Sequence, residues 1–422
     1  MPAYDVVVVG GGLGGLRAAR DLADNRRSVV VIEARDRVGG RGYTVELGGR
    51  SVELGGSWFT PEHHEVRNEL RRYDLPVRDF APIEHTRWLT AGQLRFGLPV
   101  PWGELGDLER CLLQVARDAD AVGAGDLAVA GLSAAAYIDR LAPLPAVRDF
   151  LLGWWQLMGG APPESGAVLD ALGAIADHGG MTALVTCLAH GPATGWSSLA
   201  GALAASPGIE VRLGAAVTRV VHAPGSVSVT TADGMTVDAR ALVVAVPLNC
   251  LPHLEFSPPL PEPARAAAGA NAGSAVKVLM LVRGVSPHGL AVGMTDGFKW
   301  IYVDEVRDDI VLVVGFTWRS DSFDPTSQAD VAASLQRFFP GGELVAFASH
   351  DWIGDPASRG TWLTAPAGQL DRLDPKRFEP FGNVAFAGSD MAEEHAGWFE
   401  GALRSGAAAA TYLHTELGAG LP

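Results

Sequence analysis

Residues 4–15 read Tyr-Asp-Val-Val-Val-Val-Gly-Gly-Gly-Leu-Gly-Gly, and this stretch decides how the fold begins. An apolar run that ends at glycines, then a helical pattern, then Val-Val-Val-Ile at residues 29–32 predicts a strand, a turn, a helix and a second strand. Gly10, Gly12 and Gly15 have the Gly-x-Gly-x-x-Gly spacing, where bare backbone can approach a pyrophosphate and a helix N-terminus favours negative charge. We therefore expect a βαβ unit that binds a dinucleotide.

Glu33 follows the second predicted strand of this unit. A carboxylate at this point can accept hydrogen bonds from both hydroxyls of an adenosine ribose, and it would repel a 2′-phosphate, which disfavours NADP. The alternative is a Gly-rich turn beside a solvated glutamate. Strand, turn, helix and acid in register argue against that alternative.

The segment after Glu33 reads Ala-Arg-Asp-Arg-Val-Gly-Gly-Arg over residues 34–41. It offers cations and two further glycines along which a pyrophosphate or an extended flavin chain could lie. A bare NAD site has no evident use for such a run.

The remaining chain changes several times between helical and strand patterns, and it shows no repeat of fixed period. Residues from about 61 to 203 are mostly helical in pattern, and residues 209–247 form short strands with a hairpin turn at Asp233-Gly234. Further strands are expected at 275–283, 300–304, 310–317 and 343–350. The end returns to the first texture, with a strand at 383–387 and a helix from about 397 to 413, so the cofactor domain is assembled from separated pieces.

The composition excludes several classes of function. Lys and Arg number 33 against 48 Asp and Glu, and the net charge of −15 would repel nucleic acid. Three distant cysteines show neither a disulfide framework nor a zinc spacing and fit a reducing cytoplasm. No leader peptide and no apolar run of membrane-spanning length are expected.

The run at residues 33–41, followed by Leu-Gly-Gly-Ser at 54–57, resembles the flavin monoamine oxidase family. The resemblance extends to Phe-Ala-Gly-Ser-Asp at 386–390 and to Gly-Trp-Phe-Glu-Gly-Ala at 397–402, and so reaches both ends of the chain. It implies an α/β plus α+β fold: a Rossmann-like FAD-binding domain of the p-hydroxybenzoate hydroxylase type, built from discontinuous segments, and a substrate domain with a mixed sheet and a helical insertion. We expect residues 1–75, 204–258 and 366–422 in the first domain, and 76–203 (mainly helical) and 259–365 in the second.

The resemblance also implies FAD as the cofactor and places the backbone of Val217 against adenine. Physically, a strand that ends at Gly388 and a helix that starts near Gly397 would aim a second positive helix end at the reduced flavin. An ordinary turn between strand and helix is the alternative. The cofactor-binding residues expected are Gly10, Gly12, Leu13, Gly14, Gly15, Glu33, Ala34, Arg35, Gly39, Gly40, Arg41, Gly55, Gly56, Ser57, Trp58, Val217, Val246, Trp352, Gly388, Ser389, Asp390, Gly397, Trp398 and Phe399.

Lys277 lies inside an apolar strand. Burying its ammonium group there without a partner would cost roughly several kcal/mol of desolvation free energy. The residues alone leave open whether it faces a cavity or reaches water from an edge strand. The resemblance implies that Lys277 bonds through a water to flavin N5, and that Trp362 and Trp398 flank the flavin face. It also puts Tyr302 and His178 at the substrate cavity, although His178 precedes two glycines and could instead end a helix.

Thr361 occupies the position where some animal relatives carry the cysteine that tethers flavin, so FAD should be non-covalent. The expected reaction is hydride transfer from the carbon next to an amine nitrogen to flavin N5, which gives an imine and, with O2, hydrogen peroxide. An L-amino-acid oxidase or a flavin desaturase remains an alternative, and it would need Arg95, Arg319 or Arg359 to face the flavin. An inactive flavin-binding scaffold is a third possibility, and a homodimer is left open.

Overall fold

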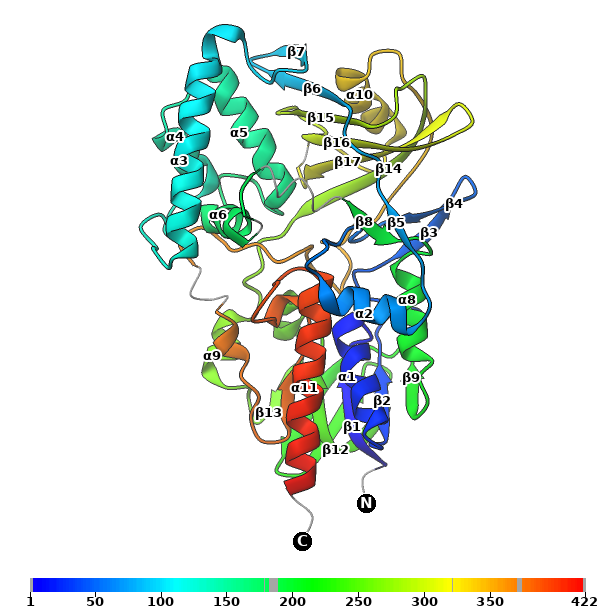
Figure 1. Ribbon diagram of the computed structural model, residues 1–422. Helices are drawn as coiled ribbons and strands as arrows, with labels where there is room; N and C mark the ends of the chain where they lie inside the picture. The colour runs from blue at the N-terminus through cyan, green and yellow to red at the C-terminus, as the bar shows by residue number, and fades with distance from the viewer. Residues whose placement is uncertain (1–2, 178, 182–188, 321, 370–373, 420–422) are drawn as a thin grey trace.

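The computed structural model describes residues 3–177, 179–181, 189–320, 322–369 and 374–419. Two large β-sheets divide the molecule into halves, with a layer of helices beside the second sheet (Figure 1). Both ends of the chain lie in the half built on the first sheet.

The first sheet has the order β13-β10-β11-β12-β1-β2-β9, and β19 pairs with β12. β1 lies between β12 and β2 and is parallel to both, and Val6–Val9 are buried on both faces, as parallel strands usually are. The strands are β1 (Tyr4–Val9), β2 (Val29–Ile32), β9 (Ile209–Arg212), β10 (Val217–Ala223), β11 (Ser226–Thr231), β12 (Thr236–Val244), β13 (Glu255–Ser257) and β19 (Val384–Phe386).

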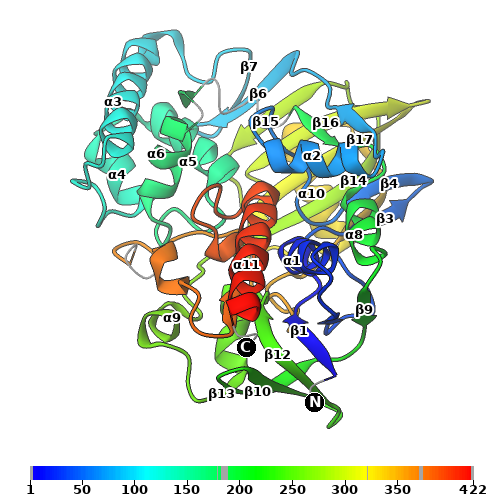
Figure 2. The same ribbon diagram turned by 60° about the horizontal axis from the view of Figure 1, so that its bottom comes forward.

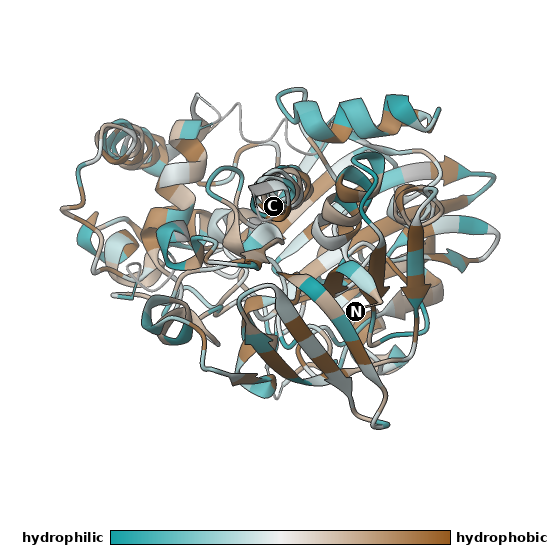
Figure 3. Ribbon diagram, turned by 90° about the horizontal axis from the view of Figure 1, so that it is seen from below, coloured by the Kyte–Doolittle hydropathy of each residue, from teal (hydrophilic) through white to brown (hydrophobic). Residues whose placement is uncertain are grey.

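Helices α1 (Leu13–Asp24) and α11 (Phe399–Ala419) pack side by side on one face of this sheet (Figures 1 and 2). α1 can approach the sheet closely because Gly15 has no side chain. A Cβ at this position would lie 2.1 Å from the carbonyl oxygen of Gly10. α8 (Trp196–Ala204) joins the same apolar layer, and the other face is covered around α9 (Glu262–Ala267). Seen from below, brown apolar bands alternate with paler or teal bands along the strands nearest the viewer (Figure 3).

The second sheet has the order β18-β14-β17-β16-β15-β6-β7. Side chains alternate along β14: Val276 and Val278 pack with α10 (Gln328–Phe338), whereas Leu279 and Leu281 face the opposite side. Lys277 lies two residues before Leu279, so its side chain points to the same side as those of Leu279 and Leu281, toward the half built on the first sheet. The strands are β6 (His85–Thr90), β7 (Gln93–Phe96), β14 (Ala275–Arg283), β15 (Gly289–Gly293), β16 (Trp300–Arg307), β17 (Ile310–Trp318) and β18 (Glu343–Ser349).

Strands β6 and β7 correct the expectation of helix from about residue 61. β6 runs parallel to β15, although most of the helical segment separates the two strands in the sequence, and β7 forms the edge of the sheet beside β6. Short half-exposed strands carry a weak pattern, and their pairing depends on a distant partner. The helices of that segment pack around one apolar cluster: α3 (Leu105–Gly123), α4 (Ala134–Arg140), α5 (Pro145–Met158) and α6 (Val168–Asp177).

Smaller elements join the halves. They are α2 (His64–Arg72) and the pairs β3 (Thr44–Leu47) with β4 (Arg50–Glu53) and β5 (Val77–Asp79) with β8 (His190–Pro192). The α/β plus α+β class expected from the sequence is confirmed. The exact domain boundaries stay a prediction, although residues 1–75, 204–258 and 366–422 supply the strands of the first sheet.

Candidate functional site

A cavity of about 1040 Å³ lies between the two halves. Its volume is at the upper end of the range typical of cofactor and ligand pockets. Residues from both sheets, from the loops after β1 and β2 and from helices α5, α6 and α11 line it. It is therefore the place where segments far apart in the sequence meet.

The turn between β1 and α1 forms one end of this cavity. Gly10, Gly12, Leu13 and Gly14 line it, and the first amides of α1 have no carbonyl partner within the helix. A Cβ at Gly14 would lie 2.9 Å from the amide nitrogen of Gly388, so the Gly388 turn seals the same corner. This corner can hold an anionic group against backbone donors. Gly15 does not line the cavity.

Glu33 is 4% exposed and lies at the edge of the cavity, just after β2. One carboxylate oxygen accepts a hydrogen bond from the amide of Gly11 at 2.7 Å, and the other accepts from the amide of Arg35 at 2.9 Å. The turn thus fixes the direction of the carboxylate, which keeps further lone pairs for a ligand.

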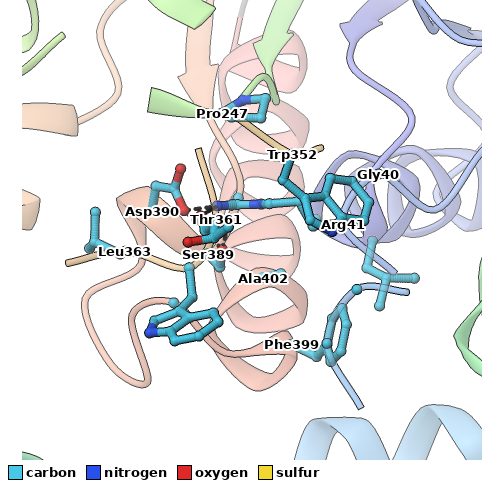
Figure 4. A pocket seen from close by; sticks show the side chains of 18 of the residues that line it. Gly40, Arg41, Pro247, Trp352, Thr361, Leu363, Ser389, Asp390, Phe399 and Ala402 are labelled. Atoms are coloured by element: carbon cyan, nitrogen blue, oxygen red, sulfur yellow. Dashed lines mark hydrogen bonds and ion pairs between the residues drawn. The ribbon is translucent and has the colours of Figure 1, made fainter. Parts of the chain in front are cut away.

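Arg41 lines the cavity and contacts Thr361, Ser389 and Asp390 (Figure 4). Its guanidinium donates to the carbonyl of Thr361 at 2.6 Å, to Ser389 Oγ at 2.8 Å and to Asp390 Oδ1 at 2.5 Å. The second oxygen of Asp390 accepts from the amide of Leu248. Arg35 is paired in a similar way with Asp355 at 2.8 Å. Both arginines expected from the sequence therefore lie at the cavity with carboxylate partners.

Helix α11 begins at Phe399, two residues after the predicted start at Gly397. A short 3₁₀ turn at Ser389–Met391 and a loop precede it, and Gly397, Trp398, Phe399 and Ala402 all line the cavity. Glu400 in the first turn is fully buried and accepts the amides of Glu65 and Val66 at the start of α2. The returning segment is thus anchored to α2 as well as to the first sheet.

Lys277 is 6% exposed and lines the cavity from the second sheet. Its Nζ donates to the carbonyl of Glu53 at 2.6 Å, to the carbonyl of Gly55 at 2.9 Å and to Ser57 Oγ at 2.5 Å. It also lies 5.5 Å from the centre of the Trp58 ring. Burial lowers the pKa of Lys277 to about 7, although the nearby Glu53 carboxylate acts in the opposite direction. Lys277 therefore faces inward and ties the second sheet to the loop that precedes Trp58.

Trp362 and Trp398 both line the cavity. The indole of Trp362 donates to the carbonyl of Met158 at 3.1 Å, and the ring of Trp398 contacts that of His63, with centroids 5.1 Å apart. Thr361 is buried, and its hydroxyl accepts from the amide of Ala275. These contacts fix two aromatic rings on cavity walls that come from different parts of the chain.

The remaining cofactor candidates have defined places. Trp352 donates its indole proton to the carbonyl of Leu54 at 3.1 Å, and its ring appears beside Gly40 and Arg41 in Figure 4. The other candidates on the cavity wall are Ala34, Gly39, Gly40, Gly55, Gly56, Ser57, Trp58, Val217, Val246, Gly388 and Ser389.

Tyr302 departs from the expectation of a substrate-cavity residue. It is 1% exposed, is not on the cavity wall, and donates its hydroxyl to the carbonyl of Ala81 at 2.6 Å. The ring packs among Trp58, Trp300 and Phe80. It is therefore a packing residue behind the wall. His178 lies outside the described residues.

Several polar wall residues were not expected from the sequence, and two of them are Gln156 on α5 and Asp170 on α6. Neither belongs to a recognisable motif. Apolar periodicity could have placed them on helices, but the face that each presents depends on how those helices pack.

FAD suits this set of residues. The cavity offers the backbone amides at the start of α1, a buried carboxylate and bare backbone at Gly12 and Gly40, which lie against each other. Trp58 and Trp300 also line it, and within the described residues their buried indole nitrogens have no hydrogen-bond partner. The described residues contain no group of side chains that could hold a metal ion. None of the helices among them is long and apolar enough to cross a membrane.

Comparisons with known proteins agree on one family. The model for flavin-containing amine oxidoreductases matches residues 13–414. (S)-6-hydroxynicotine oxidase of Paenarthrobacter nicotinovorans is 33% identical over 419 residues, which cover 95% of this chain and 97% of that protein. The structure of wild-type putrescine oxidase bound to putrescine superposes with a TM-score of 0.85 at 25% identity, over 98% of this chain and 99% of the other. Cyclohexylamine oxidase from Brevibacterium oxydans, at 20% identity and a TM-score of 0.86, has the same fold over 99% of this chain and 100% of the other.

Proposed function

Because this chain belongs to the flavin-containing amine oxidoreductase family, we propose that its amine substrate reacts beside Lys277, Trp362 and Trp398 in the cavity between the two sheets. The protein is an FAD-dependent oxidoreductase that acts on a small amine with oxygen as acceptor. Bound FAD supplies the hydride acceptor at N5 for the carbon next to the amine nitrogen, and the products are an imine, which water converts to an aldehyde or ketone, and hydrogen peroxide.

The adenosine end of FAD belongs, in this proposal, at the β1–α1 turn. Glu33 receives the ribose hydroxyls, the first turn of α1 and the Gly39-Gly40 backbone receive the pyrophosphate, and the backbone of Val217 meets the adenine. The Arg41–Asp390 pair supports this placement because it fixes three segments around the same cavity. The FAD-binding unit then comprises residues 1–75, 204–258 and 366–422, which also supply the first sheet.

Lys277 carries the proposal. It is a cation on a cavity wall whose partners are two carbonyls and a hydroxyl, with no carboxylate among its hydrogen-bond partners. With its pKa lowered to about 7, it can hold or release a proton at Nζ near neutral pH. We place a water between this Nζ and the reacting centre.

Trp362 and Trp398 bind the amine by contact with its carbon chain, or by cation–π attraction of about 0.5–2 kcal/mol where it is charged. Their proposed role is to hold the reacting carbon in place, because a neutral amine requires no strong base from the protein. The anchored indole of Trp362 and the His63 contact of Trp398 support such rigid positioning.

The positions of the arginines argue against an L-amino-acid oxidase. Arg95, Arg319 and Arg359 do not line the cavity, and the two described arginines that do, Arg35 and Arg41, are paired with Asp355 and Asp390. A substrate carboxylate would thus find no unpaired guanidinium among the described residues of the cavity wall.

A reducing cytoplasm remains the expected compartment, since Cys111 and Cys250 are free.

A panel of primary, cyclic secondary and tertiary amines and amino acids tests this function. Purified protein loaded with FAD should release hydrogen peroxide with at least one amine and bleach its flavin anaerobically. Peroxide from amino acids alone would favour the amino-acid oxidase, and a flavin that no compound reduces would favour the scaffold.

A further inference from the structure

Gln156 presents a buried amide group that nothing in the described protein satisfies. Its side chain is 1% exposed and lines the cavity from α5. Within the described residues, neither Oε1 nor Nε2 has a hydrogen-bond partner. A buried polar group left without a partner costs about 1–3 kcal/mol, so native proteins rarely keep one unless a ligand or water completes it.

Asp170 lies on the same cavity wall, on the neighbouring helix α6. Its Oδ2 accepts a hydrogen bond from the amide of Ala365 at 2.7 Å, and no basic side chain of the described residues forms an ion pair with it. Burial raises the pKa of this carboxyl to about 7. A cation beside Asp170 would favour its charged form.

The helix of Gln156 and the side chain of Asp170 both contact the segment that carries Trp362. The Trp362 indole bonds to the carbonyl of Met158, two residues after Gln156, and the partner of Asp170 is Ala365, three residues after Trp362. The helices that carry them, α5 and α6, belong to the helical layer rather than to the half that holds the βα turn (Figure 1). This wall therefore lies toward the substrate, away from the adenosine end.

Further carboxylates line the cavity. They are Asp177, Glu393 and Glu394, of which Glu394 pairs with Arg404. The described cations on the wall are already engaged: Arg35 and Arg41 by carboxylates, and Lys277 by three oxygens. Because these basic groups are engaged, the carboxylates on the wall favour the approach of a positively charged ligand group.

We propose that Gln156 and Asp170 form a subsite for a second basic nitrogen of the substrate, so that the enzyme favours diamines over monoamines. The distal ammonium donates hydrogen bonds to the free oxygen of Asp170 and to Gln156 Oε1, while the other amine meets Trp362 and Trp398. This subsite rests on the proposed function, because it binds a substrate of the same reaction.

The test compares linear diamines, from diaminobutane to diaminooctane, with monoamines of matched length on the FAD-loaded enzyme. Anaerobic stopped-flow gives the rate of flavin reduction and the apparent dissociation constant, and flavin absorption changes report binding itself. The wild type should bind its best diamine at least about tenfold more tightly than the matched monoamine, a difference that corresponds to one good charged contact.

Three variants isolate the subsite. Asp170→Asn keeps the size and the acceptor for Ala365 but loses the charge, and should abolish the diamine preference because its loss of affinity is much larger for the diamine than for the monoamine. Gln156→Met keeps the length of the side chain and should lose part of the preference. Asp139→Asn, in the same helical segment but paired with Arg148 outside the cavity, is the matched control and should keep the whole preference.

Equal affinity of the wild type for diamines and monoamines would overturn the subsite, as would parallel losses for both amines in Asp170→Asn. If Asp170→Asn does not retain FAD, an unchanged diamine preference in Gln156→Met overturns it instead. Failure of the proposed function is distinguishable: in that case no amine would reduce the flavin, but the spectral titration would still show whether diamines bind through Asp170.

Discussion

Lys277 Nζ lies 2.6 Å from the carbonyl oxygen of Glu53, a bond that connects the second sheet to the end of β4. Glu53 lies in the part of the chain that follows the βαβ unit, whereas Lys277 lies on β14 of the second sheet. Through this contact β14 of the second sheet is joined to β4 at the cavity. Several consequences of this arrangement can be measured.

Replacing Lys277 with Met should slow flavin reduction or reoxidation at least about tenfold, in the range of a lost proton-transfer group. Stopped-flow measurement of both half-reactions, per mole of bound flavin, checks this. Lys299→Met is the matched control, since Lys299 is also buried with carbonyl partners but lies off the cavity wall. Unchanged rates in both half-reactions of Lys277→Met would remove the assignment.

The stability of the apoprotein should depend on Lys277 above neutral pH. Its folded pKa of about 7 lies below the unfolded value of about 10.4, so the unfolded chain binds more protons between these limits. Its contribution to the free energy of unfolding therefore rises with pH from about 7 to about 10. Urea denaturation across this window should show a steeper rise for the wild type than for Lys277→Met, and identical slopes would contradict the lowered pKa.

Arg41→Met should weaken FAD retention and destabilise the fold by about 3 kcal/mol, because it leaves the buried Asp390 carboxylate without its cation. Flavin fluorescence on dilution and urea denaturation measure the two effects. Adding Asp390→Asn should restore part of the stability, since the buried charge is then gone. Arg219→Met, which breaks an exposed pair with Glu255, is the control and should cost less than about 1 kcal/mol. A similar cost for both arginines would refute this account.

FAD should leave the protein on acid precipitation, because Thr361 offers a hydroxyl where a tethering thiol would be needed. The yellow colour should appear in the supernatant, measured by its absorption spectrum. Colour that stays in the pellet after washing would mean a covalent link elsewhere.

Much of the cofactor half could be predicted from the sequence. The Gly-x-Gly-x-x-Gly turn, Glu33 and the Arg35–Arg41 run form a local signal, because strand, turn and helix are contiguous and their backbone requirements are written in neighbouring residues. The parallel strand β12 and the return of the chain at β19 were recognisable for a similar reason, since buried strands carry continuous apolar runs.

The sequence by itself determined the dinucleotide fold and, through family resemblance, FAD and amine oxidation. Only the tertiary structure decided which side chains face the cavity. Lys277 points inward by its parity on β14, Tyr302 is turned away toward Ala81, and Gln156 and Asp170 reach the wall because α5 and α6 pack against the second sheet and the Trp362 segment. Such orientations depend on contacts between residues hundreds of positions apart, and no local pattern specifies them.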